Sequence, residues 1–263
     1  GELTQAIEYY VRKQGYYLIY HRSKSFDESL RVMQSWQMEG VILSGVQPNE
    51  LVAWHKHLKT PAVFLDAFED QTSDIKGKIY NVGLDDRAEA KKMTDFLITA
   101  GHTEIAFLSR GGSETWQGVD ASRRDGVLDA LKQHKLSLDK SIIGIPVLIS
   151  EFEAWLDAFI SRGFDGKTAL FFASDLLASY ALSRIQHAGI KIPEDISVVG
   201  FDGNILSQVA SPKLTTIFQD LILKADMAIT LLFKQMNQDA ISENNVLIKG
   251  ELVERETVKY RQD

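Results

Sequence analysis

The sequence contains no cysteine, so neither a disulfide bond nor a thiolate metal site can form. It also has no apolar run near the roughly 20 residues that span a bilayer. No positively charged segment with a following apolar run precedes the first expected helix, so no signal peptide is indicated. A chain that does not begin with Met gives this last observation little weight. We therefore expect a cytoplasmic protein without a membrane anchor.

The sequence has fewer positively charged than negatively charged residues. The 29 Lys and Arg residues are outnumbered by 36 Asp and Glu residues, which gives a net charge of −7 at pH 7. A DNA-binding surface needs clustered Lys and Arg side chains to replace the counterions of the phosphates, and the sequence contains no such cluster. We expect that any contact with DNA is made by a part that lies outside these residues.

Motifs that would indicate catalysis or a metal site are also lacking. Residues 111–113 (Gly-Gly-Ser) do not form the Gly-x-Ser-x-Gly turn of a nucleophilic serine, and no dinucleotide-binding or complete phosphate-binding glycine loop occurs. His55 and His57 lie two apart on an expected helix, so they face different directions and cannot chelate one ion. Asp85 and Asp86 could suggest a divalent cation, but they more simply open a helix, whose positive end attracts carboxylates. The sequence predicts no enzyme, no metal site and no cofactor.

What the chain does contain is a regular alternation of short apolar runs with amphipathic segments of helical period. Strands are predicted at residues 16–20, 41–43, 62–65, 79–82, 105–108, 142–145, 169–173, 197–201 and 215–218, with extended pieces around 246–254. Helices are predicted at residues 3–14, 26–38, 49–58, 86–100, 122–134, 151–162 and 175–188 and in a last segment that ends at 236, and residues 66–78 are predicted to be a polar loop.

This alternation is typical of βαβ units with parallel sheets. Runs such as residues 62–65 are apolar throughout, as expected for strands that are buried on both faces. About ten strands are too many for one compact sheet in a chain of this size. We therefore predict an α/β fold made of two doubly wound parallel-sheet lobes.

Ligands of such sheets bind beyond the carboxyl ends of the strands. Hydroxyl, amide and carboxylate groups follow six predicted strands, which is the set of hydrogen-bonding groups that a polyhydroxylated ligand needs. They are Ser44, Asp66, Ser109, Ser174, Asp202 and Gln219. The alternative is that these side chains only cap the helices that follow. For Ser174 both interpretations, an effector contact and a helix cap, remain open.

Two stretches in the second half of the chain resemble the LacI/GalR family of transcriptional regulators. They are Ala188–Asp202, which reads AGIKIPEDISVVGFD, and Ser211–Ile217, which reads SPKLTTI. Weaker matches extend the likeness over nearly the whole chain, at residues 38–43, 61–66, 83–86, 100–108 and 173–176. Because the motifs follow in the order of the family with suitable gaps, chance similarity is improbable.

The resemblance implies a cytoplasmic homodimer whose core has two lobes, like the periplasmic sugar-binding proteins (type I), and carries a helix-turn-helix at its N-terminus. It places residues 1–82 and 219–247 in the N-terminal lobe and residues 83–218 and 248–263 in the C-terminal lobe. In the family a first strand precedes the helix that matches residues 3–14 and lies in the middle of the N-terminal sheet. The sequence contains no such strand, which predicts a gap in that sheet.

Carried over residue by residue, the effector contacts of the family fall on Ser44, Asp66, Arg123, Ser174, Asp202 and Gln219. Arg123 comes from the pattern Arg-Arg-Asp-Gly at 123–126, and an arginine can donate paired hydrogen bonds to vicinal hydroxyls or to an anion. Trp116 lies in the glycine-rich loop 111–118, where its ring could stack on a sugar with the indole N–H free to hydrogen-bond, or could be a packing anchor.

The resemblance therefore implies the ligand-binding and dimerisation core of a sugar-responsive regulator, most simply a repressor. A sugar or a sugar phosphate would bind in the cleft between the lobes and alter the binding of operator DNA by the helix-turn-helix. Effectors act in this way only by binding one conformation better than the other. The alternative from another class is a secreted sugar-binding protein of a transporter, built on the same fold.

Overall fold

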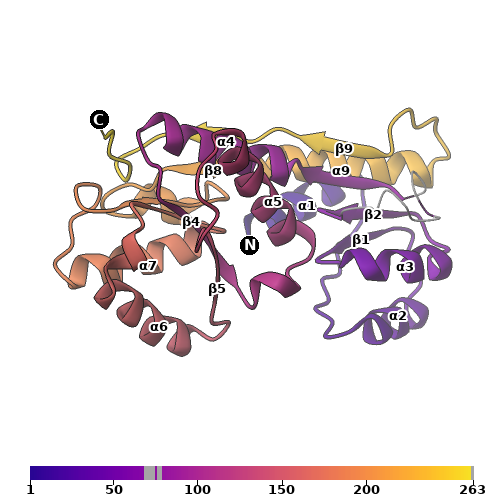
Figure 1. The fold of residues 1–263 in the computed structure, drawn as a ribbon. Coiled ribbons are helices and arrows are strands. Elements are labelled where there is room, and N and C mark those ends of the chain that lie inside the picture. Colours follow the sequence, from indigo (N-terminus) through magenta and orange to yellow (C-terminus); the bar gives the residue numbers. More distant parts are fainter. Residues whose placement is uncertain (68–74, 76–78, 262–263) are drawn as a thin grey trace. The chain divides into compact units, whose positions relative to one another are not determined.

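The structure is a computed structural model that describes residues 1–67, 75 and 79–261. Most of the polar loop that is expected at residues 66–78 lies outside these described residues. The chain forms two compact units (Figure 1). Unit 1 comprises Gly1–Leu84 and Asp220–Ile248, and unit 2 comprises Asp85–Gln219 and Lys249–Asp263.

Unit 1 is built around a parallel sheet with the strand order β1-β2-β3-β9. Its strands are β1 (Val41–Ser44), β2 (Ala62–Leu65), β3 (Asn81–Leu84) and β9 (Asn245–Ile248). Its helices are α1 (Glu2–Lys13), α2 (Phe26–Ser35), the short 3-10 turn η1 (Pro48–Glu50), α3 (Leu51–His57) and α9 (Leu221–Met236).

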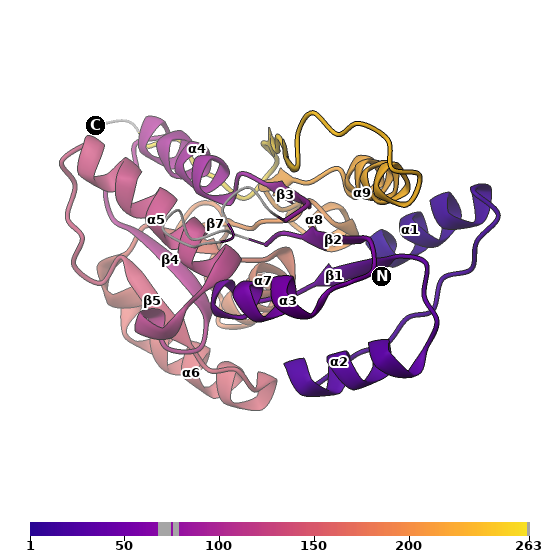
Figure 2. The same ribbon diagram turned by 90° about the vertical axis from the view of Figure 1, so that its right-hand side faces the viewer.

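The central strand β2 of unit 1 is buried on both faces, as its uniformly apolar sequence predicts. Val63 and Leu65 pack with side chains of α1 and α9, which lie side by side (Figure 2). Phe64 points to the opposite face and packs with Leu51 and Trp54 of α3. Successive strand side chains alternate between faces, so a single run of four apolar residues supplies two hydrophobic clusters.

The prediction of a strand at residues 16–20 is wrong, because this segment forms no strand in the structure. Leu18 contacts the cluster of α1 and α9, whereas Tyr17 and Tyr20 are exposed. A strand needs a neighbour that accepts and donates its backbone hydrogen bonds, and none lies beside this segment among the described residues. An open cavity of about 810 Å³ is lined by this segment and by β1.

Unit 2 is built around a second parallel sheet, with the strand order β5-β4-β6-β7, and a two-stranded antiparallel ribbon of β8 and β10. Its strands are β4 (Ile105–Arg110), β5 (Ile142–Ile145), β6 (Ala169–Phe172), β7 (Ser197–Val199), β8 (Thr216–Phe218) and β10 (Glu251–Val253). Its helices are α4 (Asp86–Thr99), η2 (Ser113–Thr115), α5 (Gly118–Gln133), α6 (Ile149–Ser161), η3 (Gly163–Gly166), α7 (Asp175–His187) and α8 (Ile205–Val209).

The core of unit 2 lies on both faces of its sheet. Leu108, Leu170 and Phe172 pack with α6 and α7 in one cluster, and both helices lie on the same side in Figure 1. Phe107 and Phe171 point to the other face, where their rings meet edge to face. The predicted parallel α/β architecture is therefore confirmed for both sheets.

His102 ties the C-terminal segment of unit 2 to the sheet. Its ring is fully buried and lies within hydrogen-bonding distance of the Thr168 hydroxyl, the Ser197 hydroxyl and the Lys259 carbonyl oxygen. Burial, together with the charge of Arg261, lowers the pKa of His102 to about 4, while the bond to the Lys259 carbonyl acts in the opposite direction. The neutral ring thus connects the C-terminal segment to the sheet.

No helix in the described part of the chain is both long enough and apolar enough to cross a membrane.

Candidate functional site

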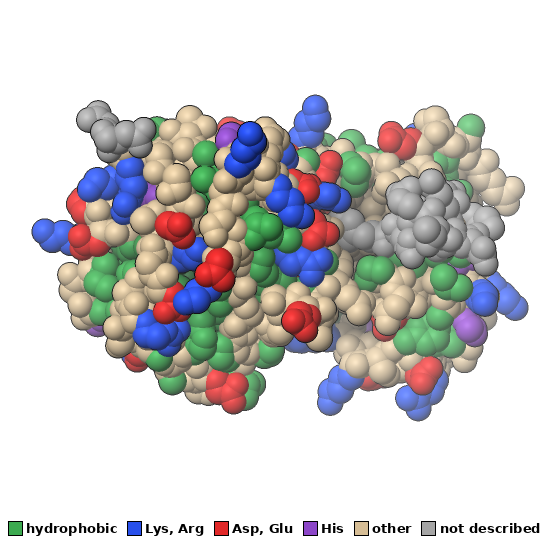
Figure 3. All heavy atoms as spheres, in the orientation of Figure 1, with side chains coloured by type: hydrophobic (Ala, Val, Ile, Leu, Met, Phe, Trp, Pro, Cys, Tyr) green, Lys and Arg blue, Asp and Glu red, His purple; other side chains and the backbone are tan. Residues whose placement is uncertain are grey.

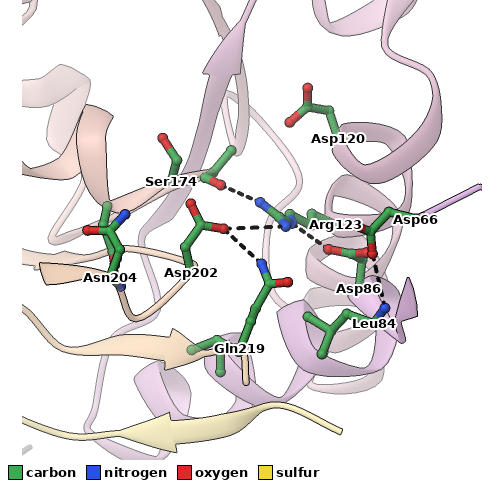
Figure 4. Close-up of polar contacts among 12 residues, drawn as sticks. Asp66, Leu84, Asp86, Asp120, Arg123, Ser174, Asp202, Asn204 and Gln219 are labelled. Carbon is green, nitrogen blue, oxygen red and sulfur yellow. Dashed lines mark hydrogen bonds and ion pairs between the residues drawn. The ribbon is translucent and has the colours of Figure 1, made fainter. Parts of the chain in front are cut away.

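Arg123 is the central residue of a polar cluster in unit 2. It projects from α5, its side chain is buried, and its Nε donates a 2.7 Å hydrogen bond to Oδ1 of Asp86 at the start of α4. Its Nη1 donates to the carbonyl oxygen of Ala173 at 2.5 Å, and its Nη2 lies 3.8 Å from Oδ1 of Asp202. Figure 4 shows the two carboxylates on opposite sides of the guanidinium. The ion pairs fix its direction within the cluster.

The guanidinium of Arg123 also lies over the ring of Phe201, 3.7 Å from the centroid. The aromatic ring thus contacts the face of the guanidinium, whose nitrogen atoms are already held by hydrogen bonds and ion pairs. Burial alone would lower the pKa of Arg123, but the charges of Asp86 and Asp202 outweigh burial and raise the pKa above its ordinary value. The side chain is therefore a permanent cation.

Asp202 follows β7 and lies in an unusual backbone conformation, with φ of +114°. Non-glycine residues adopt such angles only where the surrounding structure enforces them, and they gather at functional sites. The carboxylate accepts a 2.9 Å hydrogen bond from Nε2 of Gln219, and its backbone is bound to Ile217 and Gln219. Its side chain is 31% exposed, so a ligand from solution can reach it.

Asp175 lies beneath this cluster and is completely buried. Its two carboxylate oxygens accept hydrogen bonds from the Thr216 hydroxyl at 2.6 Å and from the backbone N–H of Asn204 at 2.9 Å. Burial raises the pKa of Asp175 to about 7, and the nearby charge of Asp202 acts in the same direction. A Cβ at Gly200 would overlap this carboxylate, so the glycine leaves room for the buried acid.

The remaining polar side chains at the strand ends of unit 2 have structural partners. Ser174 accepts a hydrogen bond from the backbone N–H of Leu177 at 3.4 Å, which is the N-cap arrangement. Ser109 donates to Oδ1 of Asp120, on the first turn of α5, at 2.8 Å. The capping alternative for Ser174 is thus the geometry that the structure shows.

Trp116 departs from the expectation of a free indole N–H. Its Nε1 donates to the carbonyl oxygen of Arg110 at 2.7 Å, and its ring meets Phe107 edge to face with centroids 5.7 Å apart. Only 8% of the residue is exposed. The indole anchors the glycine-rich loop to β4, because an aromatic ring in a buried loop gains more from packing than from exposure.

Unit 1 holds its own polar group at the strand ends. Asp66 follows β2 with φ of +54°, and its two oxygens lie 2.7 and 2.9 Å from Nζ of Lys224 on α9. Oδ1 also accepts a hydrogen bond from the backbone N–H of Leu84, drawn in Figure 4. Ser44 lies at the end of β1, the strand next to β2, and opposite Leu65 in the register. Lys224 is almost completely buried, so this charged pair forms part of the interior.

The structure therefore brings together Arg123, Asp202 and Gln219 in unit 2, whereas Asp66 and Ser44 belong to unit 1. Three residues that pair with others in these groups were not predicted as partners from the sequence: Asp86, Asp120 and Lys224. Asp86 was recognised only as a helix opener, and Lys224 shows a weak signal as a charged residue in the apolar run of α9. Among the residues described, no group of three His, Asp or Glu side chains could hold a metal ion.

Comparison with known proteins first defines the class. Residues 94–258 match the family model of the periplasmic binding protein-like domain. The fold is similar to that of the lac repressor dimer bound to operator and the anti-inducer ONPF, with a TM-score of 0.83, 23% identity, and coverage of 98% of this chain and 88% of that one. The transcriptional regulator CelR–cellobiose complex gives a TM-score of 0.83 with 20% identity, over 97% of this chain and 77% of that one.

Sequence relatives then narrow the assignment. The chain is 30% identical to the HTH-type transcriptional repressor PurR of Aliivibrio fischeri (strain ATCC 700601 / ES114), over 99% of this chain and 77% of the relative. It is 27% identical to the HTH-type transcriptional regulator MalR of Clostridium butyricum, over 98% of this chain and 77% of the relative. The chain belongs to the LacI/GalR family of transcriptional regulators and corresponds to its effector-binding core. These relatives are regulators rather than enzymes or transporter proteins.

Proposed function

We propose that the unit 2 cluster binds a small polyhydroxylated effector, a sugar or a sugar phosphate, with Arg123 and Asp202 as its main contacts. The observation that carries the proposal is the geometry of these two residues. A buried guanidinium is fixed by Asp86, and a partly exposed carboxylate in a strained conformation stands beside it. Fixed donors next to acceptors suit vicinal hydroxyl groups, because each hydroxyl both donates and accepts. Gln219 of the same unit, which donates to Asp202, is proposed as a further contact.

The effector would act on DNA through a helix-turn-helix that lies outside these residues. Support comes from the relatives, which are HTH-type regulators and of which this chain spans 77%. The chain itself carries a net charge of −7, and on the face shown in Figure 3 acidic and basic side chains are interspersed. Phosphate contacts require clustered Lys and Arg, so we assign DNA binding to another segment of a cytoplasmic regulator.

The test of effector binding is isothermal titration calorimetry with a panel of mono- and disaccharides and their phosphates. We expect one member to bind, and we expect Asp202→Asn to weaken that binding at least tenfold because an acceptor is lost. The matched control is Arg184→Gln, which removes the exposed ion pair between Arg184 on α7 and Asp157 on α6 of the same unit. Equal binding by wild type and Asp202→Asn would refute the assigned contacts.

We also propose a homodimer that forms through an apolar face of α7 and α8. Leu176 and Tyr180 on α7 and Ile205 and Val209 on α8 are exposed, each pair spaced four residues apart on its helix. Contiguous exposed apolar side chains mark association surfaces, and a related structure is that of a repressor dimer.

The oligomeric state of point variants tests this face. Val209→Asp is expected to shift the mass measured by light scattering from dimer to monomer, because it places a charge in an apolar contact. Val147→Asp is the control, since Val147 has a similar exposure, 60% against 68% for Val209, but lies outside α7 and α8. A Val209→Asp protein that stays dimeric would exclude this face.

A further inference from the structure

We infer that the effector of the unit 2 cluster is a hydroxyl-bearing molecule without a phosphate or carboxylate group. This inference rests on the proposed function and narrows it, since an arginine alone would suit either a neutral sugar or its phosphate. What decides between them is the distribution of charge around Arg123.

The positive charge of Arg123 is already compensated by the protein. Asp86 holds Nε at 2.7 Å, and Asp202 lies 3.8 Å from Nη2. Asp120 is a third carboxylate whose charge acts on the same guanidinium. One buried cation therefore stands among three acidic side chains, and an added anion would meet a negative environment.

The helix N-termini of the cluster also carry acidic side chains. A helix N-terminus binds phosphate readily because its free N–H groups and its dipole attract negative charge. In unit 2 the helices α4, α5 and α7 each carry an aspartate in the first turn: Asp86, Asp120 and Asp175. Asp85 additionally caps α4 by accepting from Ala88 N–H, and Ser174 caps α7. The N-termini of α4 and α7 are thus capped by side chains, and each of the three helices carries an aspartate whose negative charge opposes a bound anion.

The other arginines near these strand ends do not restore a phosphate site. Arg124 pairs with Asp125 at 2.8 Å and donates to the carbonyl oxygen of Ser113. Arg110 follows Ser109 in β4, and successive strand side chains point to opposite faces, so it faces away from the side on which Ser109 meets Asp120. In unit 1, taken by itself, the charge of Lys224 is balanced by Asp66.

The experiment is calorimetry with matched pairs: glucose and glucose 6-phosphate, fructose and fructose 6-phosphate, galactose and galacturonic acid, and trehalose and trehalose 6-phosphate. We expect one neutral member to bind and its charged counterpart to bind at least tenfold more weakly. The affinity of the neutral member is expected to be the same at 50 and 500 mM NaCl, because no net charge is screened.

A charge variant makes the test specific. Asp120→Asn removes one negative charge from the cluster. We expect it to lower the ratio of the two affinities, neutral member over charged member, at least threefold. Asp157→Asn, on the exposed surface of α6, is the matched control and is expected to leave the preference unchanged. Inorganic phosphate, added at constant ionic strength, is expected not to raise the melting temperature of the protein.

Two outcomes separate this inference from the proposal on which it depends. If a charged member binds as tightly as its neutral counterpart and Asp202→Asn abolishes that binding, the inference is overturned while the proposed function stands. A saturable stabilisation by phosphate that Asp120→Asn strengthens would place an anion at the cluster and would overturn it as well. If no member of the panel binds, the proposed function fails and the inference fails with it.

Discussion

Gly126 on α5 packs directly against the carbonyl oxygen of Arg87 on α4, so closely that a Cβ at this position would overlap it. One turn before Gly126, Arg123 reaches Asp86, the neighbour of Arg87. The close crossing of the two helices therefore determines the position of the buried ion pair. This explains why a glycine follows the arginines in the sequence Arg-Arg-Asp-Gly.

Gly126→Ala is expected to lower the free energy of unfolding by about 1–3 kcal/mol, because overpacking forces two helices apart. It is also expected to weaken effector binding, since the shift moves Arg123. Urea denaturation measures the first effect. Gly112→Ala is the control, because a Cβ there lies 3.6 Å from its nearest neighbour, an ordinary contact. An unchanged denaturation midpoint for Gly126→Ala would contradict the close crossing.

The Arg123–Asp86 pair is expected to behave as a single unit. Arg123→Met alone leaves the buried Asp86 carboxylate without its guanidinium partner, and breaking a buried pair in this way costs about 3–5 kcal/mol of stability. Replacing both residues in Arg123→Met/Asp86→Leu is expected to cost clearly less than the sum of the two single changes. Thermal denaturation of the four proteins of this double-mutant cycle gives the coupling. Additive effects would show that the pair contributes no coupled energy.

His102 and Asp175 are expected to give opposite pH dependences over the same range. With a pKa of about 4 against 6.5 for an ordinary histidine, folded His102 binds fewer protons than the unfolded chain, so its contribution to stability is lost as pH falls from 6.5 to 4. With a pKa of about 7 against 3.8, folded Asp175 binds more protons, so its contribution is lost as pH rises from 3.8 to 7. Each effect is on the order of 3 kcal/mol.

Variants separate these two contributions. His102→Gln is expected to show stability that falls as pH rises from 4 to 7, and Asp175→Asn is expected to show stability that rises over the same range. The wild-type protein is expected to lie between them because the two slopes oppose each other. Urea denaturation at half-unit pH steps provides the curves. Parallel curves for the two variants would refute both assignments.

Trp116→Phe tests whether the indole is a packing anchor. The change keeps the ring contact with Phe107 and removes the hydrogen bond to the Arg110 carbonyl. Stability is expected to fall by about 1 kcal/mol, the usual value of one such bond, with effector affinity unchanged within twofold. A loss of affinity of tenfold or more, without loss of stability, would show that the ring contacts the ligand instead.

Much of the fold is predictable because its signals are local. The apolar runs at 62–65 and 142–145 form strands at those bounds, and the helices predicted to begin at residues 26 and 175 begin there, each after a serine cap. The strand predicted at 16–20 fails because strand formation depends on a neighbour, which composition does not report. Helix α8 was missed because five residues are too few to show a helical period.

The site is less predictable than the fold because its partners are distant in sequence. Asp202 and Gln219 were predicted from their positions after strands, and Arg123 was predicted from the family resemblance. The structure brings these three residues into contact in unit 2. The pairing of Arg123 with Asp86, 37 residues away, depends on how α4 crosses α5. The pairing of Asp66 with Lys224 spans 158 residues. Contacts of this kind follow from tertiary packing and leave no spacing pattern in the chain.

The division of the chain into units has a consequence for its synthesis. Unit 1 ends with β9 at Ile248, and unit 2 closes its ribbon with β10 at residues 251–253. A nascent polypeptide that has emerged as far as residue 219 therefore lacks the last helix and strand of one unit and the final strand of the other. Both hydrophobic interiors are completed only when translation is nearly finished, and a contiguous gene fragment that encodes all of one unit also encodes a segment of the other.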